Sequence, residues 1–308
     1  MSGIELGGIQ PVDERIRLDS LSLRVLRWNG VPDVDRAENR LPPFLLVHGL
    51  ASNARLWDGV ARRLAQAGRS SVSVDLRGHG RSDKPDTGYD FDTVTADLAG
   101  LIGKLGLDRP IVAGQSWGAN VVLDLAVRHP DLIRGIVLVD GGLNDMRDGF
   151  PNWDECWERL APPQLVGLPL DAIEGYFRTN HADWPFEGLE GSLGNFDVRP
   201  DRTIAPWLSR ERHKLILREL WAQRPSELWP RLGVPALIVP VDSGSADWVA
   251  GKRAGVERAM AAARETGTPV RVEWFVGDHD IHAQRPAEVV SAILEAERSG
   301  LFGEVRVA

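Results

Sequence analysis

Short apolar runs alternate with amphipathic stretches along the first half of the chain. The runs that predict buried strands are residues 44–47, 71–76, 110–113 and 133–139. The stretches that carry apolar residues at helical spacing are residues 56–67, 93–105 and 119–128. Such an alternation is typical of βα units around a mostly parallel sheet. Before it, residues 16–28 predict one or two opening strands, and the polar segment 29–43 predicts a loop.

The pattern changes between residues 143 and 230. This stretch holds six of the eleven tryptophans, several prolines and few strand-like runs, so we expect a helical insertion. The earlier pattern then resumes, with strand candidates at 236–241 and 270–276 and helix candidates at 247–266 and 286–298. We therefore predict an α/β core formed by residues 1–142 and 231–308, with a helical cap at 143–230 inserted late in the sheet.

Composition and charge narrow the class of protein. A hydrophobic share of 43% and a charged share of 26% are ordinary for a globular chain, and no stretch approaches the roughly 18 uninterrupted apolar residues of a membrane span. Asp13, Glu14 and Arg15 lie where a signal peptide would need its apolar segment, so we expect a cytoplasmic protein with no membrane partner. The net charge of −8 disfavours nucleic acid as a partner.

Cys156 is the only cysteine, so the chain cannot form an intrachain disulfide. The neighbouring carboxylates of Asp154, Glu155 and Glu158 would raise the pKa of its thiol, which disfavours a thiolate nucleophile. We therefore expect the nucleophile elsewhere in the chain.

The strongest chemical signal is the segment Gly114-Gln115-Ser116-Trp117-Gly118. It joins a predicted buried strand to a predicted helix, and a GxSxG segment at such a junction forms a nucleophile elbow, a strained turn whose glycines remove side chains that would clash. Ser116 would project from the sheet edge, with free N–H groups of the helix start directed at an anionic intermediate. A glycine-rich turn without chemistry fits the five residues alone but fits their placement less well.

The segment His48-Gly49-Leu50 follows the strand predicted at 44–47, where an oxyanion loop belongs. The backbone N–H groups of Leu50 and Trp117 are the expected donors to a developing oxyanion, and each contributes about 3 kcal/mol. We expect His48 to be hydrogen-bonded beneath this loop as a structural residue, because another histidine is better placed for acid-base chemistry.

Two histidines follow the last predicted strand, in the segment 277–286. A loop after the final strand can bring an imidazole over the elbow, so His279 and His282 are both candidate bases for Ser116. These histidines and the adjacent aspartates offer too few ligands at a recognisable spacing for a metal site, and we expect no metal and no organic cofactor.

Four motifs follow one another in the chain: His48-Gly49, the segment 75–82 (DLRGHGRS), the Ser116 elbow, and a late histidine followed by Arg285-Pro286. Together they resemble the α/β-hydrolase superfamily, and more narrowly its cap-bearing esterases, lactonases, epoxide hydrolases and haloalkane dehalogenases. The resemblance covers nearly the whole chain outside the cap. It implies an eight-stranded, mostly parallel sheet flanked by helices, with the cap inserted after the sixth strand. We interpret segment 75–82 as structural.

The resemblance also favours one of the two histidines as the base and one type of reaction. In this family the histidine usually precedes an Arg-Pro pair by six and seven residues, which favours His279 over His282. Its epoxide hydrolases and haloalkane dehalogenases carry aspartate at the elbow, so Ser116 favours acyl transfer instead.

We take Asp140 as the acid that completes a catalytic triad, with Asp242 and then Asp247 as the alternatives. Family members most often carry it beyond the seventh strand, but the spacing of Asp242 and Asp247 departs from the usual one, and Gly244 falls where the carboxylate is expected. A minority place it at the end of the sixth strand, which matches Asp140. In either place a buried carboxylate must accept the Nδ1 proton of His279. Alternatively, an aspartate at 140 merely caps the following loop.

The tryptophans of the predicted cap favour an apolar ligand. We expect most of them in the core and a few in the wall of a cleft between cap and core. The candidates for substrate contact are Trp153, Trp157, Trp184, Trp207 and Trp221.

The sequence therefore predicts a serine hydrolase that cleaves a carboxylic ester or lactone of a small, apolar substrate through an acyl-enzyme. Cleavage of amide or carbon–carbon bonds, perhydrolysis and acyl transfer use the same residues and stay open. A ligand receptor that keeps a hydrolase pocket is the alternative from another class of protein. A homo-oligomer is compatible with the sequence.

Overall fold

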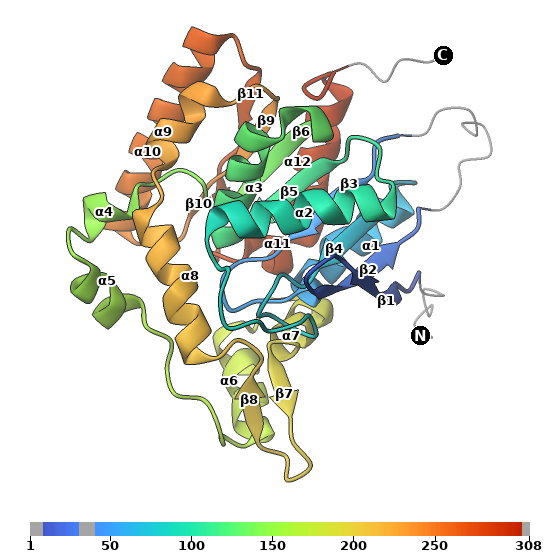
Figure 1. The fold of residues 1–308 in the computed structure, drawn as a ribbon, viewed down its shortest axis with the longest axis vertical. Helices are drawn as coiled ribbons and strands as arrows, with labels where there is room; N and C mark the ends of the chain where they lie inside the picture. The colour runs from blue at the N-terminus through green and yellow to red at the C-terminus, as the bar shows by residue number, and fades with distance from the viewer. Residues whose placement is uncertain (1–8, 31–40, 304–308) are drawn as a thin grey trace.

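One large sheet organises the chain in the computed structural model, which describes residues 9–30 and 41–303. The strand order is β1-β2-β4-β3-β5-β6-β9-β11 (Figure 1). The pairs β1–β2 and β2–β4 are antiparallel, whereas every pair from β4 to β11 is parallel. The predicted eight-stranded, mostly parallel sheet is therefore confirmed. Its strands are β1 (Val12–Arg17), β2 (Ser22–Trp28), β3 (Phe44–Val47), β4 (Ser71–Val74), β5 (Ile111–Gln115), β6 (Gly135–Val139), β9 (Ala236–Val239) and β11 (Val270–Val272).

Helices cover both faces of this sheet. Successive strand residues point to opposite faces, so Leu45 and Val47 enter one core while Phe44 and Leu46 enter the other. Burial on both faces explains why these strands show continuous apolar runs in the sequence. Helices α2 (Phe91–Leu105), α3 (Trp117–Arg128) and α10 (Ala246–Thr266) pack on the first face (Figure 1). Helices α1 (Asp58–Gln66), α11 (Ile281–Gln284) and α12 (Pro286–Arg298) pack on the second.

The segment between β6 and β9 is mainly helical and extends away from the sheet (Figure 1). The predicted helical insertion after the sixth strand is confirmed, whereas the exact domain limits at residues 142 and 230 stay a prediction. The insertion also contains an antiparallel hairpin, which the sequence did not reveal because its strands have only three residues each. The elements are α4 (Met146–Gly149), α5 (Trp153–Leu160), α6 (Leu170–Asn180), α7 (Phe186–Leu193), β7 (Phe196–Val198), β8 (Ile204–Pro206), α8 (Arg210–Ala222) and α9 (Pro225–Leu228).

Two strands that the sequence predicts as continuous are divided in the structure. Pro240 has no N–H to donate and interrupts the run 236–241, so a short β10 (Val241–Asp242) follows β9. β10 pairs in parallel with β12 (Phe275–Val276), which is separated from β11 by two residues. Short 3-10 helices complete the fold: η2 (Ala54–Trp57), η3 (Pro130–Leu132) and η4 (Trp229–Arg231).

Two further expectations from the sequence concern the loop at 29–43 and membrane-spanning helices. The loop predicted at 29–43 falls largely on residues 31–40, which lie outside the described residues. In the part of the chain that the structure describes, no helix combines the length and apolar character that crossing a membrane requires.

Candidate active site

Ser116 occupies the turn between β5 and α3. Its backbone angles of φ 54° and ψ −123° are strained for a residue with a side chain. Close packing explains the glycines on either side. A Cβ on Gly114 would lie 2.3 Å from the carbonyl oxygen of Gly118, and a Cβ on Gly118 would lie 2.4 Å from that of His48. The turn therefore requires glycine at both positions.

Ser116 and Asp140 occupy equivalent places on neighbouring strands. Gln115 of β5 pairs with Val139 of β6, so Ser116 and Asp140 are the next residues at the carboxyl edge of the sheet. The N–H of Ser116 donates to Val139 O, and that of Asp140 to Val239 O, both at 2.9 Å. Both residues then take positive φ, 54° and 47°. The strand register thus brings a hydroxyl and a carboxylate to one edge, where ligands of open α/β sheets bind.

The carboxylate of Asp140 accepts a hydrogen bond from His279. Nδ1 of His279 lies 2.5 Å from Oδ2 of Asp140, and the N–H of Val241 donates to Oδ1 at 2.9 Å. The Asp140 side chain is 0% exposed, whereas that of His279 is 52% exposed. Because Nδ1 faces a carboxylate, it carries the proton, and Nε2 keeps the lone pair that a general base needs.

Lys252, which was not among the candidates predicted from the sequence, is a further partner of Asp140. Its Nζ donates to the Asp140 carboxylate and to Val241 O, both at 2.8 Å. The lysine side chain is only 10% exposed. A signal was present, because Lys252 lies on the same face of α10 as the buried Val249 and Val256. A cation at an apolar helix position indicates a buried partner.

The neighbouring charges set the protonation states of Asp140 and His279. Burial acts to raise the pKa of Asp140, but the hydrogen bond from His279 and the charges of His279 and Lys252 outweigh it and hold this pKa below its ordinary value. Burial acts to lower the pKa of His279, but the bond to Asp140 and the charges of Asp280 and Asp140 raise it, while Lys252 opposes the rise. Asp140 is therefore ionised beside a histidine whose protonated form is stabilised.

Ser116, Asp140 and His279 line one cavity of about 440 Å³. Among the described residues, no hydrogen bond joins the Ser116 hydroxyl to His279. In many enzymes this contact tightens only in the substrate complex. Most of the wall is apolar, and its apolar members are Leu50, Leu143, Met146, Leu160, Leu217, Leu220 and Trp248.

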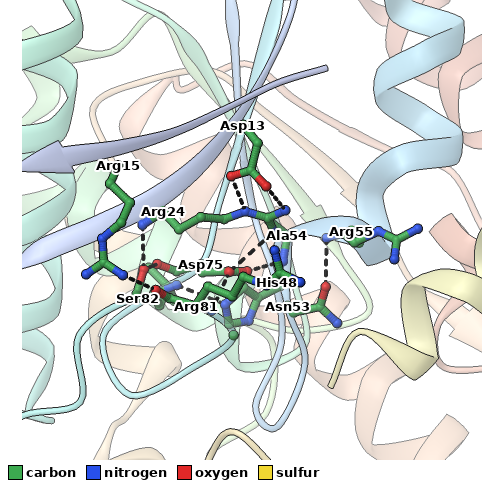
Figure 2. Close-up of polar contacts among 12 residues, drawn as sticks. Asp13, Arg15, Arg24, His48, Asn53, Ala54, Arg55, Asp75, Arg81 and Ser82 are labelled. Carbon is green, nitrogen blue, oxygen red and sulfur yellow. Dashed lines mark hydrogen bonds and ion pairs between the residues drawn. The ribbon is translucent and has the colours of Figure 1, made fainter. Parts of the chain in front are cut away.

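Buried hydrogen bonds hold the loop after β3 in place (Figure 2). Nε2 of His48 accepts from the N–H of Leu76 at 3.0 Å, and its Nδ1 donates to Gly49 O at 2.7 Å. Asp75 accepts from the N–H of Ala54 at 2.7 Å, as Figure 2 shows. Both nitrogens of His48 are thus used within the fold, in agreement with the structural role expected from the sequence.

Segment 75–82 joins this loop to the first strands. The N–H of Arg81 donates to Asp75 at 2.9 Å, and the guanidinium of Arg24 lies between Asp13 and Asp75 (Figure 2). A Cβ on Gly80 would lie 2.2 Å from the Asp75 carboxylate. The segment therefore supports the site from beneath rather than entering the cavity.

Comparisons with known proteins identify the fold. A family model described as "alpha/beta hydrolase fold" matches residues 42–172. The solved structure of E-2-(acetamidomethylene)succinate hydrolase is similar with a TM-score of 0.71 and 25% identity, over 92% of this chain and 98% of that one. The chain belongs to the α/β-hydrolase superfamily. The expectation drawn from the four sequence motifs is confirmed.

Curated relatives of this α/β-hydrolase match over shorter stretches. A 2-(acetamidomethylene)succinate hydrolase of Mesorhizobium japonicum is 39% identical over 99 residues, which are 32% of this chain and 35% of that protein. Epoxide hydrolase A of Mycobacterium tuberculosis is 34% identical over 117 residues, 37% of this chain and 36% of that protein. The alignments thus span about a third of the length of these relatives.

The other acids weighed for this α/β-hydrolase have different partners. Asp242 accepts from the N–H of Gly244 at 3.1 Å and lies 4.0 Å from Arg253. Asp247 is exposed at the start of α10, where it lines a neighbouring cavity. Among the described residues, neither carboxylate forms a hydrogen bond or ion pair with His279.

His282, the rival histidine, is buried beneath the site. Its ring packs against Trp57 with centroids 4.3 Å apart, and neither ring nitrogen has a hydrogen-bond partner among the described residues. Burial lowers its pKa to about 3, so the ring is neutral. It is not among the residues that line the cavity with Ser116.

The five tryptophans proposed as substrate contacts do not reach the Ser116 cavity. None of Trp153, Trp157, Trp184, Trp207 and Trp221 is among the described residues that line the Ser116 cavity. The indole N–H of Trp184 donates to Asp278, the residue before His279, at 2.6 Å, and Trp207 lines a separate polar cavity. Among the described residues, the tryptophan that lines the Ser116 cavity is Trp248 of α10, which falls outside the predicted cap and so was not a candidate.

Two further expectations from the sequence concern Cys156 and a metal site. Cys156 is buried in α5, and burial raises the pKa of its thiol to about 11, which keeps it protonated. Within residues 9–30 and 41–303, no three His, Cys, Asp or Glu side chains gather as a metal site would require.

Proposed function

We propose that this α/β-hydrolase is a serine hydrolase that cleaves a carboxylic ester or a lactone with an apolar or aromatic part. The observation that carries the proposal is the 2.5 Å contact of Asp140 with His279 in a cavity that Ser116 also lines. A strained serine, a histidine with a free Nε2 and a buried carboxylate are the groups that nucleophilic acyl transfer needs.

In the first half-reaction, Nε2 of His279 accepts the proton of the Ser116 hydroxyl while the oxygen attacks the substrate carbonyl. The oxyanion accepts hydrogen bonds from the backbone N–H groups of Leu50 and Trp117. Trp117 is the first residue of α3, so its N–H has no partner within the helix. The imidazolium then protonates the leaving alcohol oxygen, and an acyl-serine remains.

In the second half-reaction, water takes the place of the alcohol. His279 accepts a proton from the water, whose oxygen attacks the acyl-serine through the same oxyanion. Collapse of this intermediate releases the carboxylic acid, and the proton returns to Ser116. In both halves the carboxylate of Asp140 stabilises the imidazolium, and Lys252 holds that carboxylate in place.

Two features support the substrate class. The wall of leucines with Met146 and Trp248 favours an apolar acyl or alcohol part. Serine at position 116 supports attack on a carbonyl rather than opening of an epoxide, for which the family uses aspartate. The printed names of the relatives include both a succinate-derivative hydrolase and an epoxide hydrolase, so the bond that is cleaved needs a direct test.

The test compares matched substrates. Steady-state rates would be measured for p-nitrophenyl esters of two to eight acyl carbons, for γ- and δ-lactones, and for p-nitroanilides of the same acids. Ester or lactone turnover that exceeds anilide turnover and falls to the uncatalysed background in Ser116→Ala supports the proposal. Faster anilide turnover identifies an amidase. Ester turnover that persists in Ser116→Ala overturns the assigned nucleophile.

A further inference from the structure

The apolar wall of the Ser116 cavity contains one histidine outside the catalytic group. His213 belongs to α8 in the inserted segment, and its residue is only 7% exposed. It lines the same cavity as Ser116 and His279. Its helix neighbour one turn later, Leu217, also lines the cavity, so this face of α8 forms part of the wall.

The imidazole of His213 is buried in the cavity wall. Among the described residues, no hydrogen bond involves either of its ring nitrogens; Nδ1 is fully buried, whereas Nε2 is not. A buried polar atom normally has a partner, because desolvation without one is unfavourable. A ligand in the cavity cannot reach the fully buried Nδ1, so the nitrogen that can meet a ligand oxygen from this wall is Nε2.

The protonation state of His213 limits the ligand groups that it can hydrogen-bond. Burial, with a smaller contribution from the charge of Arg210, lowers the pKa of His213 to about 4. The ring is thus neutral near pH 7 and offers one N–H donor and one lone pair. Arg210 and Lys214 do not line the cavity, and their charged groups lie over the Trp157 ring at 4.9 and 5.1 Å.

We propose that His213 is a specificity-determining residue that hydrogen-bonds an uncharged oxygen, such as a ketone or hydroxyl, in an otherwise apolar substrate. The proposal rests on the proposed acyl transfer at Ser116 and adds a second polar group to the substrate. The charged lining residues support an uncharged oxygen, because Lys252 is paired with Asp140 and is not free to balance a carboxylate.

The hydrogen bond from His213 would discriminate between substrates that carry the oxygen and those that lack it. A substrate that carries the oxygen satisfies His213, whereas an all-carbon analogue of equal length leaves the nitrogen unpaired in the complex. One such hydrogen bond corresponds to a preference of about tenfold in kcat/KM. A carboxylate-bearing analogue gains less, because a neutral imidazole does not compensate its lost hydration.

The experiment uses matched pairs of p-nitrophenyl and alkyl esters. In each pair one ester carries a ketone or hydroxyl at a single position along the acyl or alcohol chain, and the other carries a methylene there; a third carries a terminal carboxylate. We expect at least one oxygen position to be preferred by about tenfold in kcat/KM. We also expect His213→Phe to abolish this ratio and His213→Gln, which keeps a donor, to retain part of it.

Leu217→Ala is the matched control, because it alters the same wall without changing its polar groups and should change both members of a pair by the same factor. Circular dichroism and thermal unfolding would verify that each variant is folded. The inference is overturned if no oxygen position is preferred, if the carboxylate is preferred, or if His213→Phe and His213→Gln both keep the wild-type ratio.

A binding measurement separates this inference from the proposed function. Isothermal titration of the same pairs into Ser116→Ala, with and without His213→Phe, needs no turnover. Selective binding that is lost with His213, in a wild-type protein that turns over no ester, supports the inference and refutes the proposed function. Ester turnover without selective binding refutes the inference and leaves the proposed function standing.

Discussion

Lys252 and His279 share one carboxylate oxygen. Oδ2 of Asp140 accepts from Nζ of Lys252 at 2.8 Å and from Nδ1 of His279 at 2.5 Å. After the larger effect of His279, the lysine charge also lowers the pKa of the carboxylate, but it disfavours a second positive charge on the imidazole. Lys252 therefore orients the acid and at the same time restrains the basicity of His279.

Replacing this lysine should shift the pH dependence of catalysis. Lys252→Met removes a positive charge that lowers the pKa of His279, so that pKa should rise. Because the base must be unprotonated, the acid limb of kcat/KM should move to higher pH. The measurement is a pH profile of kcat/KM for one p-nitrophenyl ester with wild type and variant.

Lys252→Arg serves as the control, because it keeps the positive charge and should leave the acid limb near the wild-type position. A profile for Lys252→Met that only decreases in height, with the limb unmoved, would mean that the lysine stabilises the fold without tuning the histidine.

The identity of the acid can be tested by paired amide substitutions. Asp140→Asn cannot stabilise the His279 imidazolium and should lower kcat by about 10⁴-fold, as expected for loss of a triad carboxylate. Asp242→Asn should leave kcat within a few-fold of wild type, because the polar partners of the Asp242 carboxylate among the described residues are Gly244 and Arg253. Steady-state ester hydrolysis measures both.

Thermal unfolding of both variants is needed beside the rates, because Asp140→Asn also leaves the Lys252 charge buried without its partner. Equal and near-normal rates in two folded variants would remove both aspartates from the mechanism.

Local sequence patterns predicted the sheet well because each strand is buried on both faces. The runs 44–47 and 133–139 coincide closely with β3 and β6, since burial on two sides requires continuous apolar residues. The elbow at Ser116 was equally predictable, because close backbone contacts require its two glycines. Each of these signals lies within a few residues of chain.

The rest of the site depends on contacts between distant segments. Asp140 and His279 are 139 positions apart, so local spacing could not distinguish Asp140 from Asp242 as the acid. Lys252 and His213 belong to helices whose polar residues usually face solvent, and only their place on the buried helix face indicated otherwise. The cavity wall formed by Trp248 likewise depends on how α10 packs, which no local pattern specifies.

Close packing of Gly141 against the turn at Ser116 should exclude a side chain at position 141. A Cβ on Gly141 would lie 2.2 Å from the carbonyl oxygen of Ser116, so Gly141→Ala should displace the elbow and destabilise the fold by about 1–3 kcal/mol. Urea unfolding would measure the free energy, and ester hydrolysis should fall in the same variant.

Gly103→Ala provides the comparison, because Gly103 is an exposed position of α2 where an added Cβ meets nothing within 4 Å. It should raise the free energy of unfolding by up to about 1 kcal/mol. Equal effects of the two substitutions would contradict the close packing inferred at the elbow.

Buried His282 should make the fold sensitive to acid. Its folded-state pKa is lowered to about 3, so below the unfolded-state value the unfolded chain binds more protons. The free energy of unfolding should therefore fall as pH decreases below about 6.5, by at most about 1.4 kcal/mol per pH unit from this residue. His282→Leu should show a weaker decline and keep ester turnover.

Urea unfolding of both proteins at pH 7.5, 6 and 5 measures this difference. His48, His79 and His213 also have lowered pKa values and contribute in the same direction, so the comparison with wild type isolates His282. Parallel pH curves would show that His282 is not buried in its neutral form, and loss of turnover would return it to the list of candidate bases.

The central claim is that Ser116 is an activated nucleophile. It is tested most directly by labelling with a fluorophosphonate probe, followed by mass mapping of the modified peptide, with p-nitrophenyl ester turnover measured on the same protein. The account predicts one adduct on Ser116, absent in Ser116→Ala and formed much more slowly in His279→Gln. Labelling of another residue alongside steady turnover, or turnover with no adduct at Ser116, would contradict it.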